Sequence, residues 1–89
     1  MALRLIEQQL LRTMLGADSS HPGFRNRYYV SVLSPHYQTL NRMVREGLVM
    51  VVSKTETSSG GVIVKFAATR EGCLAAGLTE EQTKGALEG

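Results

Sequence analysis

The chain has 89 residues, of which 43% are hydrophobic and 20% are charged, and these proportions are ordinary for one globular domain. They exclude a disordered or collagen-like chain, and the longest apolar run, Leu48–Val52, is far too short to span a bilayer. The single cysteine, Cys73, excludes an internal disulfide and is compatible with a reducing cytoplasm.

The net charge is only +2, but the charged residues are unevenly distributed. Residues 1–70 contain nine Lys and Arg against four Asp and Glu, whereas residues 71–89 contain one Lys against four Glu. The basic excess in the larger part favours a polyanionic partner, because neutralised phosphates release counterions. A solvated surface with randomly scattered charge is the alternative that an excess of this size leaves open.

The first predicted element is a helix over Ala2–Leu15. Its apolar residues recur along one side, and Gly16 follows as a residue type that commonly ends helices. The stripe is wide for so small a domain, so we expect this helix to serve as a homodimer interface. The apolar residues are Leu3, Ile6, Leu10, Leu11, Met14 and Leu15.

Residues 18–23 are predicted as a loop, and the segment Phe24–Leu33 that follows has two interpretations. Its loose alternation and its content of aromatic and β-branched residues favour a short strand. Pro22, however, could equally be the first residue of a short helix running to about Tyr29.

A second helix is predicted over Ser34–Glu46. Ser34 is a good N-cap, and Pro35 suits the first helical position because the N–H that proline lacks is not needed there. One side of this helix is apolar, and it consists of Tyr37, Leu40, Met43 and Val44.

A β-hairpin is predicted next, with strands Leu48–Val52 and Val62–Phe66 joined by a turn at Ser58–Gly61. A short final helix starts near Thr69 and ends by Leu78. We therefore expect one domain over residues 1–78 and a polar, flexible tail over residues 79–89. Thr79-Glu80-Glu81-Gln82 could instead begin another helix with a capping box.

The stretch Ser34–Leu78 resembles the recognition helix, wing and closing helix of winged helix-turn-helix repressors. The resemblance is carried by Leu40-x-x-Met43-Val44-x-x-Gly47-Leu48-Val49 and, after the hairpin, by Phe66-x-x-Thr69-x-x-Gly72. It implies an α+β fold and a DNA-binding function. A normal winged helix also has a supporting helix before the recognition helix, and the segment before Ser34 leaves room only for a short or irregular one.

A second, narrower resemblance joins Arg25-Asn26-Arg27-Tyr28 to the later Gly47-Leu48-Val49. This pattern is similar to that of small phage and prophage proteins, most of which have no assigned function. The resemblance implies phage origin and therefore a location in the cytoplasm of a bacterial host. Degenerate winged helices also serve as protein-binding modules, which leaves a protein partner as an alternative.

Polar residues of the predicted recognition helix suit base edges, since Arg can bond guanine bidentately and Asn or Gln can do so with adenine. Lysines of the hairpin would add phosphate contacts. The alternative for the helix is a solvated face on which Arg42 pairs with Glu46. The candidate nucleic-acid-binding residues are Gln38, Asn41, Arg42, Arg45, Lys54, Lys65, Arg25 and Arg27.

Residues 25–29 form a basic-aromatic cluster of a kind that binds nucleic acid or a protein surface. The alternative places a tyrosine in the core with the arginines beside it, and we expect one tyrosine in and one out. The candidate protein-contact residues are Tyr28, Tyr29 and Tyr37.

No catalytic motif is visible, and His21, His36 and Cys73 lack the spacing of metal ligands. We therefore expect neither enzyme activity nor a cofactor. The predicted function is that of a small phage-type winged-helix protein that binds duplex DNA as a transcriptional regulator. The alternative is an adaptor that binds a host or phage protein.

Overall fold

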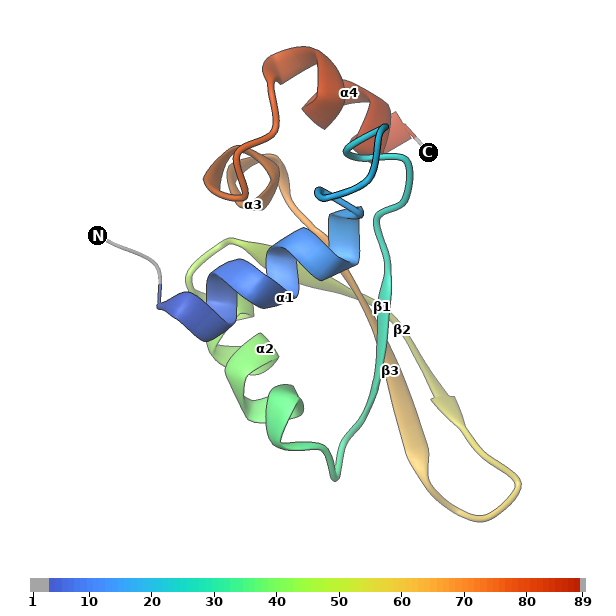
Figure 1. Ribbon diagram of the computed structural model, residues 1–89. Helices are drawn as coiled ribbons and strands as arrows, with labels where there is room; N and C mark the ends of the chain where they lie inside the picture. Colours follow the sequence, from blue (N-terminus) through green and yellow to red (C-terminus); the bar gives the residue numbers. More distant parts are fainter. Residues whose placement is uncertain (1–3, 89) are drawn as a thin grey trace.

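A three-stranded antiparallel sheet runs through the molecule, and helices pack against one of its faces and at one of its ends (Figure 1). The computed structural model describes residues 4–88. The predicted α+β class is confirmed. The elements are α1 (Leu5–Leu15), β1 (Tyr28–Ser31), α2 (Pro35–Arg45), β2 (Val49–Glu56), β3 (Val62–Ala68), α3 (Arg70–Ala75) and α4 (Glu80–Glu88).

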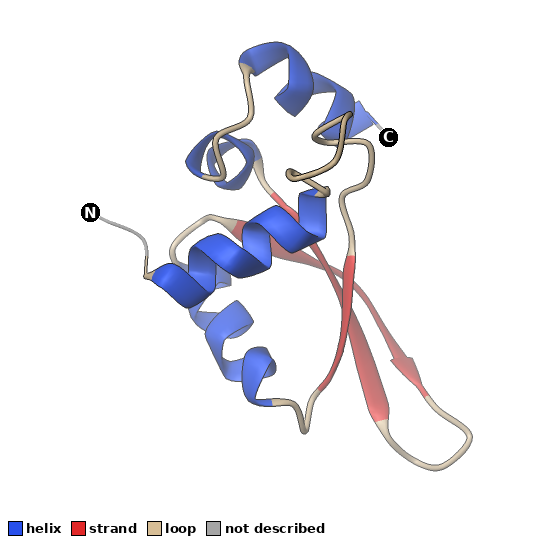
Figure 2. Ribbon diagram, viewed as in Figure 1, coloured by secondary structure: helices blue, strands red, loops and turns tan. Residues whose placement is uncertain are grey.

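Strand β3 is the centre of the sheet, in the order β1-β3-β2. Val64, Phe66 and Ala68 of β3 are buried, and side chains paired with them in register lie on the same face, which we call the covered face. The opposite face, which we call the open face, carries Tyr29 and Met50, exposed at 59% and 46%. Figure 2 shows α1 and α2 on the same side of the strands and the β2–β3 hairpin extending beyond the helices.

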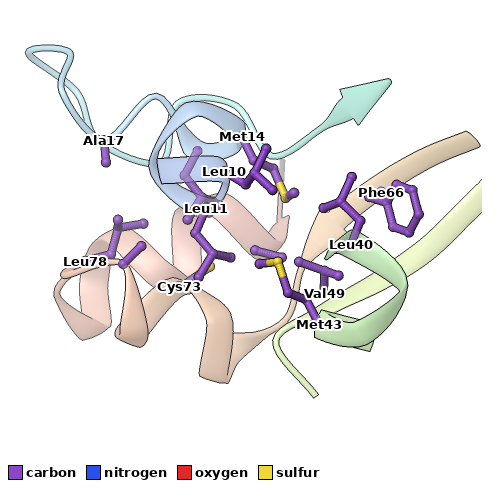
Figure 3. Close-up of a cluster of buried hydrophobic side chains, with 14 of the residues drawn as sticks. Leu10, Leu11, Met14, Ala17, Leu40, Met43, Val49, Phe66, Cys73 and Leu78 are labelled. Carbon is purple, nitrogen blue, oxygen red and sulfur yellow. The ribbon is translucent and has the colours of Figure 1, made fainter. Parts of the chain in front are cut away.

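The core joins α1, α2, α3 and the covered face of the sheet in one cluster (Figure 3). Most of the apolar stripe predicted for the first helix packs into this core, because four of its residues are buried within the chain itself. Among the described residues of α1, Leu5 and Ile6 stay exposed, while Ala2 and Leu3 lie outside the described part. The buried residues of the stripe are Leu10, Leu11, Met14 and Leu15.

The ambiguous segment before α2 contains a strand, so the interpretation of Pro22–Tyr29 as a helix is wrong. Two hydrogen bonds extend the strand pairing beyond β1. Both come from the Asn26 side chain: its Nδ2 donates to the backbone carbonyl of Ala68 (3.1 Å), and its Oδ1 accepts the backbone N–H of Ala68 (2.7 Å). Tyr28 packs against the core and Tyr29 points to the open face, which confirms the expected division of the two tyrosines.

Side-chain caps begin the other helices where the sequence predicts them. Ser34 Oγ accepts the N–H of His36 (3.2 Å) at the start of α2. At the C-terminal end, the N–H of Gln82 donates to Thr79 Oγ1 (3.1 Å), and Gln82 Oε1 accepts the N–H of Thr79 (2.9 Å). This capping box begins α4, so residues 80–88 form a helix rather than the expected flexible tail.

Helix α4 packs on α3 and on the loop before β1. Its buried residues are Thr83 and Ala86, and Gly23 of the loop approaches both Ala86 and the carbonyl of Gln82. The small side chains on this side of α4 allow the close contact, which makes residues 80–88 part of the packed unit.

A close backbone contact explains the spacing between Gly47-Leu48 and Thr69-x-x-Gly72. The N–H and hydroxyl of Thr69 donate to the carbonyls of Leu48 (3.0 Å) and Gly47 (2.5 Å), while Thr69 Oγ1 accepts the N–H of Gly72 (3.2 Å). The start of α3 therefore rests on the connection between α2 and β2. A Cβ atom at position 72 would overlap the carbonyl oxygen of Leu48.

Gly72→Ala should destabilise the protein by about 1–3 kcal/mol, because α3 must shift away from the α2–β2 connection to make room for a methyl group. Gly85→Ala is the matched control, since it also places alanine in a helix but meets no atom within 4 Å. Urea denaturation followed by circular dichroism measures both variants. The control should unfold at the wild-type urea concentration or slightly above it. A Gly72→Ala midpoint as high as that of Gly85→Ala would contradict the contact.

Candidate nucleic-acid interface

The four polar residues predicted on the recognition helix lie on one side of α2. Their positions, 38, 41, 42 and 45, follow the spacing of one helix face. Gln38 and Arg45 are exposed, whereas Asn41 and Arg42 are half-buried. Helical geometry therefore brings together the residues that the sequence singled out.

Arg42 is not free on this side, because it pairs with a buried acid on α1. Its Nε lies 3.6 Å from Oε2 of Glu7, with the two side chains exposed at 36% and 3%. The ion pair found for Arg42 is thus the one with Glu7, rather than the one with Glu46 considered from the sequence. The pair fastens α2 to α1, and Gln38, Asn41 and Arg45 are left to face solvent.

Glu7 is the buried acid of a small charged cluster between α1 and the end of α2. Burial raises its pKa, but hydrogen bonds from the backbone of Arg4 (3.1 Å) and from the side chain of Glu46 act in the opposite direction. The positive charges of Arg42 and Arg4 add to them, so the net pKa of Glu7 is lowered. The hydrogen bond to Glu7, burial and the negative charge of Glu7 raise the pKa of Glu46. Of the two carboxyls, Glu7 is therefore the one whose charged form the fold favours.

The two candidate lysines of the hairpin lie on opposite faces of the sheet. Lys54 pairs in register with Val64 and so lies on the covered face, toward α2. Lys65 pairs with Tyr29 and Ser53 and lies on the open face. The single surface expected to join α2 with both lysines is therefore divided in two.

Lys65 belongs instead to a second group of candidates, which we call the basic-aromatic surface: Phe24, Arg25, Arg27, Tyr29 and Lys65. Phe24 is 62% exposed, and the guanidinium of Arg25 lies over its ring, 5.5 Å from the centroid. The ammonium of Lys65 lies over the ring of Tyr29 at 5.8 Å. Each exposed ring thus has a cation beside it.

Two adjoining hollows lie on this surface and share Arg25 and Arg27 in their linings. The larger, about 300 Å³, reaches Tyr29, and the smaller, about 100 Å³, reaches Phe24 and Lys65. No Asp or Glu is among the described residues that line them. The hollows are therefore electropositive.

Hydrogen bonds to α1 and β3 hold the backbone of this surface in place. Asn26 is bound to both polar backbone groups of Ala68, and the Arg25 guanidinium donates to the carbonyl of Thr13 near the end of α1 (2.7 Å). The sequence pattern selected Arg25, Arg27, Tyr29 and Lys65 but omitted Phe24. Phe24 could have been found from the sequence, because it is an aromatic residue between a glycine and an arginine and outside any predicted core position.

The three tyrosines considered for protein contact do not form one exposed surface. Tyr28 and Tyr37 pack against the core, and the ring of Tyr37 meets Phe66 edge-on with 6.2 Å between centroids. Of the three, Tyr29 alone is exposed, and it lies on the open face.

The described residues contain no group of three potential metal ligands among His, Cys, Asp and Glu. Cys73 is fully buried in the core, and burial raises the pKa of its thiol. None of the helices within residues 4–88 has the length and apolar character needed to cross a bilayer. No protein-family model, curated protein or solved structure matches the chain.

Glu7→Gln should lower the free energy of unfolding at neutral pH by about 1–2 kcal/mol, because it removes the charge facing Arg42 in a partly buried pair. Glu80→Gln is the control, since it breaks an exposed pair with Arg70 (2.7 Å) and should cost less than about 0.5 kcal/mol. Urea unfolding of the two variants at neutral pH gives the comparison.

The effect of Glu7→Gln should also depend on pH. Because the pKa of Glu7 is lowered in the folded state, its stabilisation is fully present above the ordinary glutamate value of about 4.3 and is lost as the pH falls through the folded pKa. The stability difference between wild type and Glu7→Gln should therefore be constant above about pH 5 and shrink between about pH 5 and pH 3. A difference that stays constant over this range would show that the charge of Glu7 is not what stabilises the pair.

Proposed function

We propose that the protein binds duplex DNA as a small winged-helix regulator, with α2 as its recognition helix. The observation that carries this proposal is the alignment of Gln38, Asn41 and Arg45 on the solvent-facing side of one helix. Their side chains have the hydrogen-bonding groups that base edges in the major groove require.

The hairpin supplies the second part of the proposed contact. Strand β2 follows α2 after a short connection, and Lys54 of β2 lies on the sheet face toward α2. A helix inserted in the major groove would bring Lys54 toward the adjacent backbone, where its ammonium could neutralise a phosphate. Lys65, on the other face, has no part in this contact.

The helix arrangement is reduced relative to a normal winged helix. Residues 32–48 contain one helix, and α1 packs beside it through the Glu7–Arg42 pair. In the proposed complex, α1 takes the place of the supporting helix. Arg42 then positions α2 rather than reading bases.

A protein-binding adaptor is the second candidate function, and the exposed edge of β2 favours it. Met50, Val51 and Val52 are each more than 40% exposed on a strand that has only one neighbour. Exposed apolar edge strands are sites where a strand from another protein can add to a sheet. A host or phage protein would be the partner.

Arg45→Ala combined with Lys54→Ala should weaken binding to a labelled random-sequence duplex by about tenfold at low salt. The slope of log K against log salt concentration should fall in magnitude by about 2, because two phosphate-neutralising groups are removed. Fluorescence anisotropy titrations at several salt concentrations measure both quantities. Arg42 is left intact because its removal would strand the buried Glu7.

Lys84→Ala is the matched control, as it removes an exposed lysine from α4, at the end of the molecule away from the hairpin turn (Figure 1). It should retain the wild-type affinity within about twofold. The proposal fails if wild-type protein does not bind duplex at low salt, or if the Arg45 and Lys54 double variant binds as tightly as Lys84→Ala.

A further inference from the structure

The two strongly exposed aromatic rings of the described chain lie together on the basic-aromatic surface. Phe24 and Tyr29 are 62% and 59% exposed, whereas Tyr28, Tyr37 and Phe66 pack into the core. Exposed rings gain free energy when a flat apolar group stacks on them. Phe24 lies against Gly16 at the end of α1, yet both rings remain mostly exposed and therefore open to a ligand.

The charges of this surface are left unpaired, in contrast to several others in the chain. Arg12 pairs with Asp18 (2.6 Å), Arg42 with Glu7 and Arg70 with Glu80. Within residues 4–88, no acid forms an ion pair with Arg25, Arg27 or Lys65. Three cations with no acid between them form a site suited to an anionic partner.

We propose that the basic-aromatic surface binds single-stranded nucleic acid, with bases stacked on Phe24 and Tyr29 and the backbone held by Arg25, Arg27 and Lys65. Alternating rings and cations are what a strand of bases and phosphates requires. The bases of a duplex are stacked on one another and have no free faces to offer the rings. The two hollows beside the rings receive the phosphates, since each is lined by both arginines.

The charge of the surface would also suit an acidic protein segment, but the rings distinguish the two partners. A polyanion without bases needs only the cations, so loss of the aromatic faces would not weaken its binding. The presence of a cation beside each exposed ring favours a ligand that uses both groups at once.

This site is independent of the proposed duplex contact. Tyr29 and Lys65 lie on the open face, whereas α2 and Lys54 lie on the covered face. Substitutions on one face therefore leave the other unchanged, and either proposal can fail alone.

The test is anisotropy with a labelled oligothymidylate of about 15 nucleotides, a length that covers a site of this size. Phe24→Leu combined with Tyr29→Leu keeps apolar side chains but removes both aromatic faces. This double variant should bind at least about fivefold more weakly. The protein has no tryptophan, so quenching of tyrosine emission on binding should report stacking, and Tyr29→Leu should abolish most of it.

Substitution of the cations tests the electrostatic part. Arg27→Glu should weaken binding about tenfold or more and reduce the salt dependence. The structure gives the Arg27 side chain no hydrogen bond within residues 4–88, so its replacement should leave folding intact, whereas Arg25 also binds the carbonyl of Thr13. Arg45→Ala combined with Lys54→Ala is the matched control and should bind oligothymidylate like wild type. Urea midpoints verify that each variant is folded.

Three results would overturn the proposal. The first is no binding of oligothymidylate by wild-type protein at low salt. The second is wild-type affinity in the folded Phe24 and Tyr29 double variant. The third is equal competition by polyglutamate, which would identify a general polyanion surface. Binding that requires bases, both rings and Arg27, but not Arg45 or Lys54, would support it even if the protein fails to bind duplex.

Discussion

Within residues 4–88, α1 and α2 pack against one face of the sheet, and this constraint determines which surfaces are left for contact with a partner. Strand β3 turns Val64, Phe66 and Ala68 toward the helices, and that burial supplies the centre of the core. Side chains alternate between faces along a strand, so the remaining residues of the sheet are assigned to the open side.

The local elements were largely predictable because their signals are local. Ser34 and Pro35 predict the start of α2, and Gly16 predicts the end of α1, since caps depend on residues adjacent in sequence. The strand β1 was ambiguous because its pairing depends on β3, which lies more than thirty residues away. The role of Asn26 was unpredictable for the same reason, because the residue that it binds, Ala68, is also distant in sequence.

The sequence alone could not predict which face of the sheet Lys54 lies on, and the reason is geometric. A bulge interrupts the pairing of β2 with β3 between Val51 and Ser53. Simple alternation from Val49, which faces the core, would place Lys54 on the open face. The extra residue at Val52 reverses the alternation and turns Lys54 toward the covered face. The sequence thus identified both lysines, but their separation depends on one inserted residue.

The charged residues fall into two groups: those near α2 are partly paired with acids, and those of the basic-aromatic surface are not. On the side of α2, the charge of Arg42 is opposed by the buried carboxylate of Glu7, 3.6 Å away. At the basic-aromatic surface, Arg25, Arg27 and Lys65 line hollows whose described linings contain no acid. Long-range attraction follows uncompensated charge, so under the two proposals a polyanion would be drawn first to the basic-aromatic surface. The proposed recognition by α2 would instead depend on hydrogen bonds and fit to base edges, which act at short range and need little net charge.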